Sequence, residues 1–186
     1  MLKLKEKLYA IRHSPYVKSG FTLIEILVVI GILAIIVVVG STSFFNLLKG
    51  STKTKTVNLV RQNGDYALEV MSRMIRNARG IVGIERGVKN PFSEITITNP
   101  DGKTTTFACR KSEEDIASNS ASLISGQVRV DDCSQIFYVE RDTTGLQPDK
   151  VTINFTLESG VGSARPEEQA SINFETTVIL RNLAED

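Results

Sequence analysis

Few side chains in this sequence have the types and spacing that catalysis requires. The single histidine, His13, lies in the basic stretch that precedes residue 21, so residues 21–186 contain no imidazole. Its absence there removes the Ser/His/Asp and Cys/His nucleophile arrangements and the histidine-based zinc sites from consideration. We therefore predict a protein that is not an enzyme, with no catalytic residue, no metal and no cofactor.

Glu25 is the side chain whose position most needs a chemical explanation. It is the only charged residue from Phe21 to Leu48, a segment dominated by apolar residues. An ionised carboxylate in hydrocarbon costs at least about 2.5 kcal/mol, so we expect a partner for it. Ile26–Leu48 would span about 35 Å as a helix, enough to cross the hydrocarbon core of a bilayer. The segment therefore predicts a membrane helix with one unusual acid near its start.

The charges on the two sides of this segment predict its orientation. Residues 1–20 contain five basic residues and one acidic residue, a net charge of +4, which leaves −3 for residues 21–186. By the positive-inside rule the N-terminus stays in the cytoplasm, and the residues after about position 50 are extracytoplasmic. A signal peptide or a signal anchor would show the same outline, but a cleavable apolar region is usually about 7–15 residues long and carries no acid.

The residues Lys18-Ser19-Gly20-Phe21-Thr22-Leu23-Ile24-Glu25 resemble the class III signal of type IV pilins and of the pseudopilins of type II secretion systems. The resemblance implies that prepilin peptidase cuts between Gly20 and Phe21 and that Phe21 is then N-methylated. It also implies that Glu25 pairs with the amine of Phe21, on the same or a neighbouring subunit, which would select the register of subunit docking during filament assembly. A position of Glu25 in the headgroup region or against its own N-terminus is the alternative.

A helical period continues beyond the apolar segment. Small and apolar residues recur at spacings of three and four on one face, at Val60, Gly64, Ala67, Met71, Met74 and Ala78. We expect one helix from about Leu23 to Ala78, stopped by Gly80, whose second half packs on a globular body. This two-part helix is also similar to that of pilins. Many major pilins carry a proline in the apolar half, whereas residues 21–48 contain none, which favours a minor pilin or a pseudopilin.

After Gly80 the pattern changes to the two-residue alternation of strands. Glu94–Thr98 and Lys103–Phe107 flank the turn sequence Asn99-Pro100-Asp101-Gly102, which predicts a β-hairpin. Further strands are expected at Gln127–Val130, Gln135–Glu140, Val151–Leu157 and Ala170–Leu180. We therefore predict an α+β fold in which a long N-terminal helix packs on a C-terminal antiparallel β-sheet.

Cys109 and Cys133 are the two cysteines, and an even number in an extracytoplasmic domain favours a disulfide over a metal site. The bridge would tie an exposed polar loop that contains Lys111–Asp115 and continues to Ser125. Two free thiols are the alternative if the organism lacks oxidative folding.

Two other features could indicate a ligand, nucleic acid in one case and calcium in the other. Arg73, Arg76 and Arg79 form a basic stripe that could bind nucleic acid, but the acidic body argues against general binding, and a solvated helix end explains arginines there more simply. The acids of the segment Arg141–Asp149 could bind calcium, although ordinary turn chemistry explains them better.

Four regions follow from these patterns: a leader peptide at 1–20, a transmembrane or filament-core half of the helix at 21–48, an amphipathic half at 49–80, and an extracytoplasmic β-rich domain at 81–186. We expect a structural subunit, a minor pilin or pseudopilin, of a type IV pilus-like filament. Its partners would be prepilin peptidase, other pilin subunits and the inner-membrane assembly platform. It would begin as a single-pass cytoplasmic membrane protein and end in a cell-surface pilus or periplasmic pseudopilus. The alternative is a membrane-anchored extracytoplasmic binding module that does not polymerise.

Overall fold

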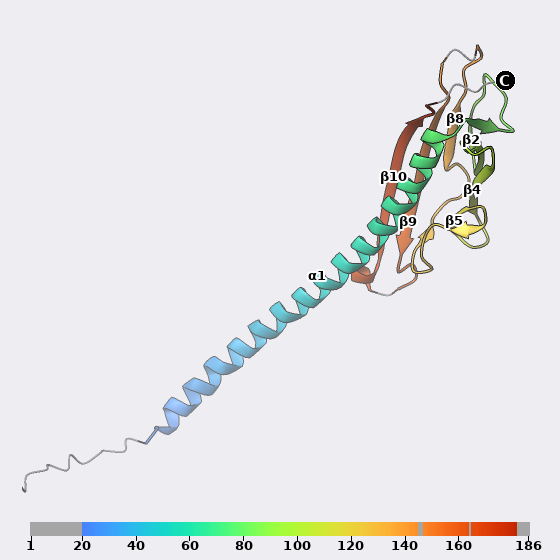
Figure 1. Ribbon diagram of the computed structural model, residues 1–186. Coiled ribbons are helices and arrows are strands. Elements are labelled where there is room, and N and C mark those ends of the chain that lie inside the picture. Colours follow the sequence, from blue (N-terminus) through green and yellow to red (C-terminus); the bar gives the residue numbers. More distant parts are fainter. Residues whose placement is uncertain (1–19, 145–146, 164, 182–186) are drawn as a thin grey trace, which may run out of the picture. The chain divides into compact units, whose positions relative to one another are not determined.

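The computed structural model describes residues 20–144, 147–163 and 165–181. His13 and most of the predicted leader lie outside this part of the chain. The described residues form one long helix, α1 (Leu23–Asn77), followed by ten strands and a short 3-10 helix, η1 (Pro166–Glu168) (Figure 1). The chain divides into two compact units between Phe45 and Asn46. The predicted α+β fold, with a long helix before antiparallel strands, is confirmed.

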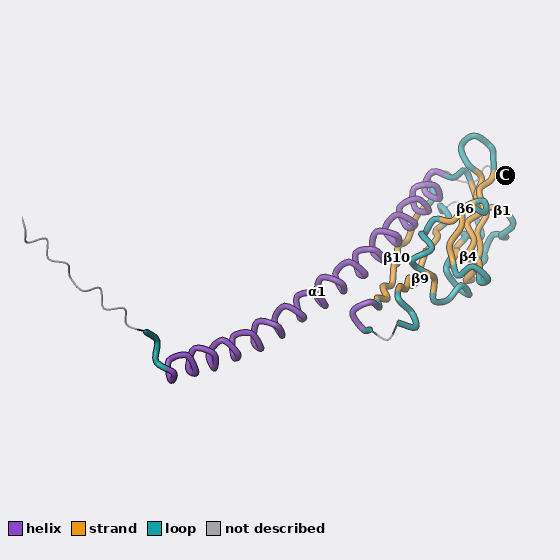
Figure 2. Tube along the Cα trace, turned by 90° about the horizontal axis from the view of Figure 1, so that it is seen from below, coloured by secondary structure: helices purple, strands orange, loops and turns teal. Residues whose placement is uncertain are grey.

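Two antiparallel sheets build the second unit (Figure 2). One sheet has the strand order β1-β3-β4-β5-β6, and the other has the order β10-β9-β8-β2, with β7 also paired to β9. The bounds of the strands are β1 Gly80–Val82, β2 Lys89–Phe92, β3 Glu94–Thr98, β4 Thr104–Arg110, β5 Asp115–Ser118, β6 Ala121–Ser122, β7 Arg129–Val130, β8 Phe137–Glu140, β9 Lys150–Ser159 and β10 Ala170–Ile179.

The core of this unit is formed by the second half of α1 and by residues of both sheets, and β9 and β10 lie beside the helix (Figure 1). The helix buries a single face at spacings of three and four: Val60, Gly64, Ala67, Met71 and Ile75. β9 contributes every second residue, with Val151, Ile153, Phe155 and Leu157 buried. The sequence prediction depended on these two spacings, three to four residues in the helix and two in the strand. Apolar burial of this kind is the main favourable term in folding.

The β3–β4 hairpin forms where it was predicted. Thr98 pairs with Thr104, and the Asn99 N–H donates to the Lys103 carbonyl oxygen at 2.7 Å. Gly102 has a φ of +82°, a conformation that glycine adopts without steric cost.

The exposed loop predicted between the two cysteines is wrong in part. β5 and β6 form a second hairpin within it, and Ile116 and Ala117 on β5 are buried. The two turn residues Asn119 and Ser120 both have positive φ, 47° and 73°, as a tight hairpin turn of the primed type requires. The turn was missed because Ser120 occupies the position where glycine is the usual signal.

The helix ends before the glycine that was expected to stop it. α1 ends at Asn77, and Gly80 instead opens β1, where it pairs with Thr98. The Arg79 N–H donates to the Thr98 carbonyl oxygen at 2.8 Å, so the backbone has already joined the sheet edge. Strand pairing, rather than glycine, therefore sets this boundary.

Candidate processing and assembly segment

The predicted cleavage site lies just before the first turn of α1. Gly20, Phe21 and Thr22 are not helical, and α1 begins at Leu23. The Thr22 hydroxyl oxygen accepts a hydrogen bond from the Glu25 N–H at 3.3 Å, and the Thr22 carbonyl oxygen accepts one from the Ile26 N–H at 3.2 Å. Thr22 is thus the N-cap of α1. The bond between Gly20 and Phe21 lies ahead of the cap, outside the helical hydrogen-bond ladder.

Gly20 and Phe21 are both exposed. A Cβ added at Gly20 would meet no atom within 4 Å in the described part of the chain. Because Gly20 has no side chain, a protease could approach the backbone of this bond closely.

Glu25 lies in the first turn of α1, where the positive end of the helix dipole favours a carboxylate. Within residues 20–144, 147–163 and 165–181 no ion pair of Glu25 is found. The sequence prediction did not assign Thr22 a role, although the Thr22-x-x-Glu25 spacing is a known helix-start signature.

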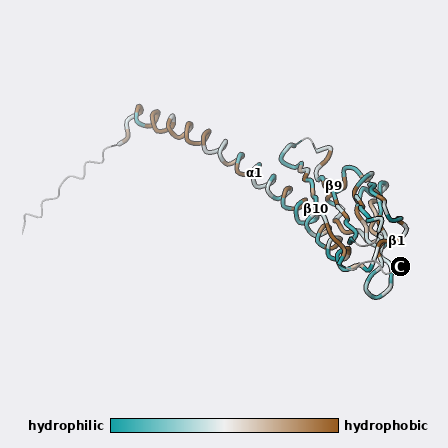
Figure 3. The backbone as a smooth tube through the Cα atoms, turned by 90° about the horizontal axis from the view of Figure 1, so that it is seen from above, coloured by the Kyte–Doolittle hydropathy of each residue, from teal (hydrophilic) through white to brown (hydrophobic). Residues whose placement is uncertain are grey.

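In the described part of the chain, the apolar side chains that follow are not covered by other residues. The large apolar residues between Phe21 and Leu48 are 45–79 % exposed, and they colour the first part of α1 brown in Figure 3. By length and composition α1 could cross a membrane. The hydroxyl groups of Ser41, Thr42 and Ser43 donate to carbonyl oxygens three or four residues earlier, at 2.7–3.1 Å, so they need no water as a partner.

The family model described as the prokaryotic N-terminal methylation motif matches residues 17–41. This chain carries the signal of type IV pilins and pseudopilins. The motif supports a pilin-type substrate of prepilin peptidase, and it is a structural rather than an enzymatic family motif. The matched segment contains Gly20, Phe21 and Glu25 and ends within the apolar part of α1. Neither the curated proteins nor the solved structures yielded a match to the chain.

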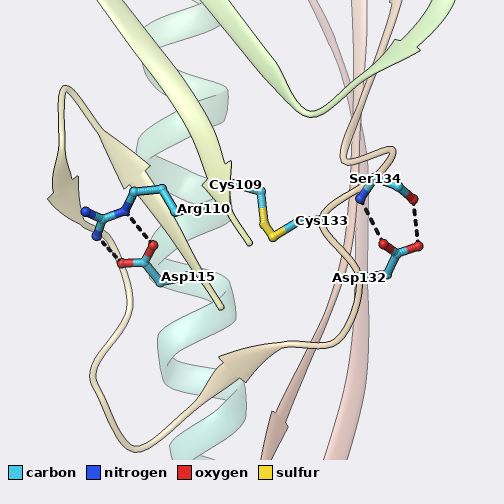
Figure 4. The surroundings of a disulfide bond; sticks show 6 residues. All are labelled: Cys109, Arg110, Asp115, Asp132, Cys133 and Ser134. Carbon is cyan, nitrogen blue, oxygen red and sulfur yellow. Dashed lines mark hydrogen bonds and ion pairs between the residues drawn. A yellow bond between two sulfur atoms is a disulfide. The ribbon is translucent and has the colours of Figure 1, made fainter. Parts of the chain in front are cut away.

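In the second unit, Cys109 and Cys133 are joined by a disulfide with a Cα–Cα distance of 5.3 Å (Figure 4). It ties the end of β4 to the segment that leads into β8. Next to it, the Arg110 guanidinium donates two hydrogen bonds to the Asp115 carboxylate, with the Nε–Oδ1 distance at 2.7 Å. These bonds, helped by one from Ser122, hold the pKa of Asp115 below its usual value. On the other side, Ser134 donates through its N–H and its hydroxyl to Asp132, which lowers the pKa of Asp132.

The acids for which calcium was considered are engaged in other contacts. The Asp142 carboxylate accepts hydrogen bonds from the N–H and the hydroxyl of Thr144, and buried Asp149 pairs with Arg141 at 3.0 Å. Among the described residues no group of three His, Cys, Asp or Glu side chains is placed to hold a metal ion. Turn formation and an internal ion pair account for the acids of this segment that are described.

Proposed function

We propose that this chain is a structural subunit, a minor pilin or pseudopilin, of a type IV pilus-like filament. Prepilin peptidase would cut it between Gly20 and Phe21 and methylate Phe21, and the mature subunit would assemble through α1. In this proposal residues 21–48 are the transmembrane and later the filament-core half of the helix, and residues 49–80 are the amphipathic half that carries the domain at 81–186.

One observation carries the proposal: the methylation motif lies on the start of a helix whose apolar side chains are uncovered in the described part of the chain. Apolar surface of this extent needs lipid or the apolar surface of other subunits around it. Cleavage ahead of Phe21 would leave the helix on the mature chain, so the same residues could anchor the subunit in the membrane and later pack in a filament.

The proposed partner of Glu25 is the new amine that cleavage creates at Phe21. The amine would begin four residues before Glu25, on the same or a neighbouring subunit. A buried carboxylate without a partner is penalised in an apolar environment, so a subunit would gain most where its Glu25 meets an amine. The N-cap at Thr22 supports this proposal because it keeps Glu25 at a fixed place in the first turn.

The charge pattern supports an orientation with the N-terminus in the cytoplasm and the body outside, because residues 1–20 carry a net +4. The subunit would wait in the cytoplasmic membrane, meet prepilin peptidase and the inner-membrane assembly platform there, and leave with other pilin subunits for a cell-surface pilus or a periplasmic pseudopilus.

The test is the intact mass and the N-terminal sequence of the protein purified from cells that have its native processing machinery. The proposal expects a mature chain that begins at N-methylated Phe21. Gly20→Val should accumulate as an uncut chain, whereas Gly31→Ala, at an equally open position within the helix, should be cut normally. A chain that keeps Met1, or that begins beyond Ser41, would overturn the processing step.

Electron microscopy of sheared surface material and of envelope fractions tests the filament step separately. Processed protein that never enters a filament, with wild-type behaviour of Glu25→Ala, would instead indicate a membrane-anchored binding module that does not polymerise.

A further inference from the structure

Two hollows of opposite charge lie on the second unit. The first, about 330 Å³ in volume, is lined by Glu69, Ser72, Arg73, Arg76, Asn77 and Arg181, a net charge of +2. Arg73 and Arg76 belong to the last turns of α1, and Arg181 follows β10 more than a hundred residues later in the chain. The Arg181 N–H donates to the Arg76 carbonyl oxygen at 3.0 Å, which fixes the two segments side by side.

The arginines of this basic hollow are available to an external anion. In the part of the chain that the structure describes, Arg110, Arg129, Arg141 and Arg165 each pair with a carboxylate, whereas Arg73, Arg76 and Arg181 do not. The helix dipole explains why arginines are favourable in the last turns of α1. It does not explain why a third arginine from the other end of the chain joins them.

The second hollow, about 550 Å³ in volume, has the opposite charge. Its ionisable lining consists of Glu113, Glu114, Asp115 and Glu158 together with Arg110 and Arg129, a net charge of −2. Both of these arginines are already paired with acids of the same hollow, Arg110 with Glu113 and Asp115, and Arg129 with Glu114. Glu158 has no ion pair among the described residues.

The two hollows lie at opposite ends of β9. Arg181 is two residues beyond Ile179, which pairs with Lys150 at the start of β9. Glu158 is near the end of the same strand, where its backbone lies opposite Arg129 of β7 and Ser171 of β10 in the strand register. At about 3.3 Å per residue, the eight residues from Lys150 to Glu158 separate the two ends by about 26 Å. The basic hollow and the acidic hollow are therefore separated along the direction of the longest strands.

We propose that these hollows are the two halves of a head-to-tail contact, in which the basic hollow of one copy receives the acidic hollow of the next. Two different surfaces that bind each other generate an open filament rather than a closed dimer. The contact rests on the proposed filament function and adds to it a surface on the body that orients neighbouring subunits. A carboxylate partner fits better than nucleic acid because residues 21–186 carry a net −3, which would repel a long polyanion.

The experiment uses two full-length copies with different tags, expressed together in cells with the native processing machinery. One tag is used to isolate the protein from detergent-solubilised membranes, and the amount of the other tag measures association at about 0.1 M and 1 M salt. Arg73→Glu with Arg76→Glu makes both hollows acidic, and Glu113→Lys with Glu158→Lys makes the second hollow basic. Each variant is expected to associate with itself at least about tenfold less than wild type at low salt.

The decisive pairing is between the two variants. A copy with the reversed basic hollow and a copy with the reversed acidic hollow should associate with each other far better than either does with itself. Misfolding cannot produce this recovery. Arg61→Glu with Arg79→Glu and the single change Glu175→Lys are the matched controls, because these exposed residues do not line either hollow and should leave association unchanged.

Equal association of all pairings, as contact through α1 alone would give, would overturn the head-to-tail contact while leaving the filament proposal intact. Wild-type copies that are processed but do not associate would overturn the contact and count against the filament as well. Binding of a labelled DNA duplex by wild type that the Arg73→Glu, Arg76→Glu variant loses, without any effect on self-association, would assign the basic hollow to nucleic acid and overturn the proposal.

Discussion

Gly64 on α1 and Phe174 on β10 pack so closely that a Cβ at position 64 would lie 2.1 Å from the Cζ atom of the phenylalanine ring. The ring cannot easily move away, because Phe174 also stacks on Phe155 of β9 with ring centroids 5.4 Å apart. Glycine in a helix interior costs about 1 kcal/mol relative to alanine, and here that cost is offset by the close approach of helix and sheet.

Replacing this glycine should therefore destabilise the body despite the better helix propensity of alanine. Gly64→Ala is expected to lower the free energy of unfolding by about 1–3 kcal/mol, because the new methyl group must displace a packed ring. Thermal unfolding of the full chain in detergent, followed by the circular dichroism of the strands, measures the effect. Gly50→Ala, where a Cβ meets nothing within 4 Å, is the matched control and should be neutral or slightly stabilising. Gly64→Ala should also cost much less in a Phe174→Leu background, and an equal cost there would contradict the packing explanation.

The disulfide should stabilise the body mainly through the unfolded chain. Cys109 and Cys133 are 24 residues apart, and closing a loop of that length is worth about 3–3.5 kcal/mol in the chain-entropy account. Cys109→Ser with Cys133→Ser should therefore lower the midpoint of denaturant unfolding, and a reductant should lower that of the wild type to a similar value. A reductant that has no effect on wild type, with mass spectrometry showing two free thiols, would show that the bridge is not formed in the protein.

Acid should destabilise the region beside the disulfide. The hydrogen bonds from Arg110 hold the pKa of Asp115 below its unfolded value of about 3.8. A carboxylate with a depressed folded pKa contributes stability above the unfolded pKa and loses that contribution as the pH falls through the folded one. Unfolding free energies measured from pH 7 down to pH 2 should therefore fall most steeply below about pH 4.

Asp115→Asn tests the assignment of this acid dependence. The variant should be less stable than wild type at pH 7 and should show a shallower loss towards pH 2. Some slope should remain, because Asp132 and Glu168 also have lowered pKa values, each from a serine hydroxyl that donates to the carboxylate. Glu175→Gln changes an exposed carboxylate of β10 and should reproduce the wild-type profile. An Asp115→Asn profile parallel to that of wild type would assign the acid sensitivity elsewhere.

Residues with a local sequence signal were predicted well. The buried face of α1 was readable from Val60 to Met71 because helical burial repeats every three to four residues, although the next fully buried residue is Ile75 and Met74 is only partly buried. The β3–β4 hairpin was readable because Asn99-Pro100-Asp101-Gly102 has turn chemistry. The N-terminal methylation motif was readable because it is short and contiguous.

Features that depend on distant parts of the chain were not predicted. Nothing local in the sequence brings Arg181 to Arg76, because their contact depends on β10 returning beside α1. The β5–β6 hairpin was not predicted because Asn119 and Ser120 adopt positive φ without a glycine in the turn. Thr22 is different: its spacing to Glu25 was a usable signal for the helix start, and only the structure drew attention to it.

The N-cap at Thr22 should be measurable in the helix itself. Thr22→Ala removes the side-chain oxygen that accepts from the Glu25 N–H, which also donates to the Thr22 carbonyl oxygen at 3.1 Å, and should cost about 1 kcal/mol at the helix start. Hydrogen exchange of the Glu25 amide in micelles should become about fivefold faster. Thr22→Ser keeps the hydroxyl and should exchange like wild type. Unchanged exchange in Thr22→Ala would mean that the carbonyl oxygen of residue 22, rather than the threonine hydroxyl, satisfies this amide.

Glu25→Gln separates the two roles that the N-terminal segment would have. The change removes the charge but keeps the size and the hydrogen-bonding capacity of the side chain, so cleavage between Gly20 and Phe21 should proceed and the intact mass should be that of the mature chain. Without a carboxylate to pair with the Phe21 amine, the processed subunit should stay in the membrane, and its amount in sheared filaments should fall at least about tenfold. Asp65→Asn, which neutralises another exposed acid of α1, should assemble normally. Normal filaments from Glu25→Gln would contradict the pairing, because the glutamine amide cannot neutralise the charge of the amine. Glu25 would then act only in stabilising the start of the helix.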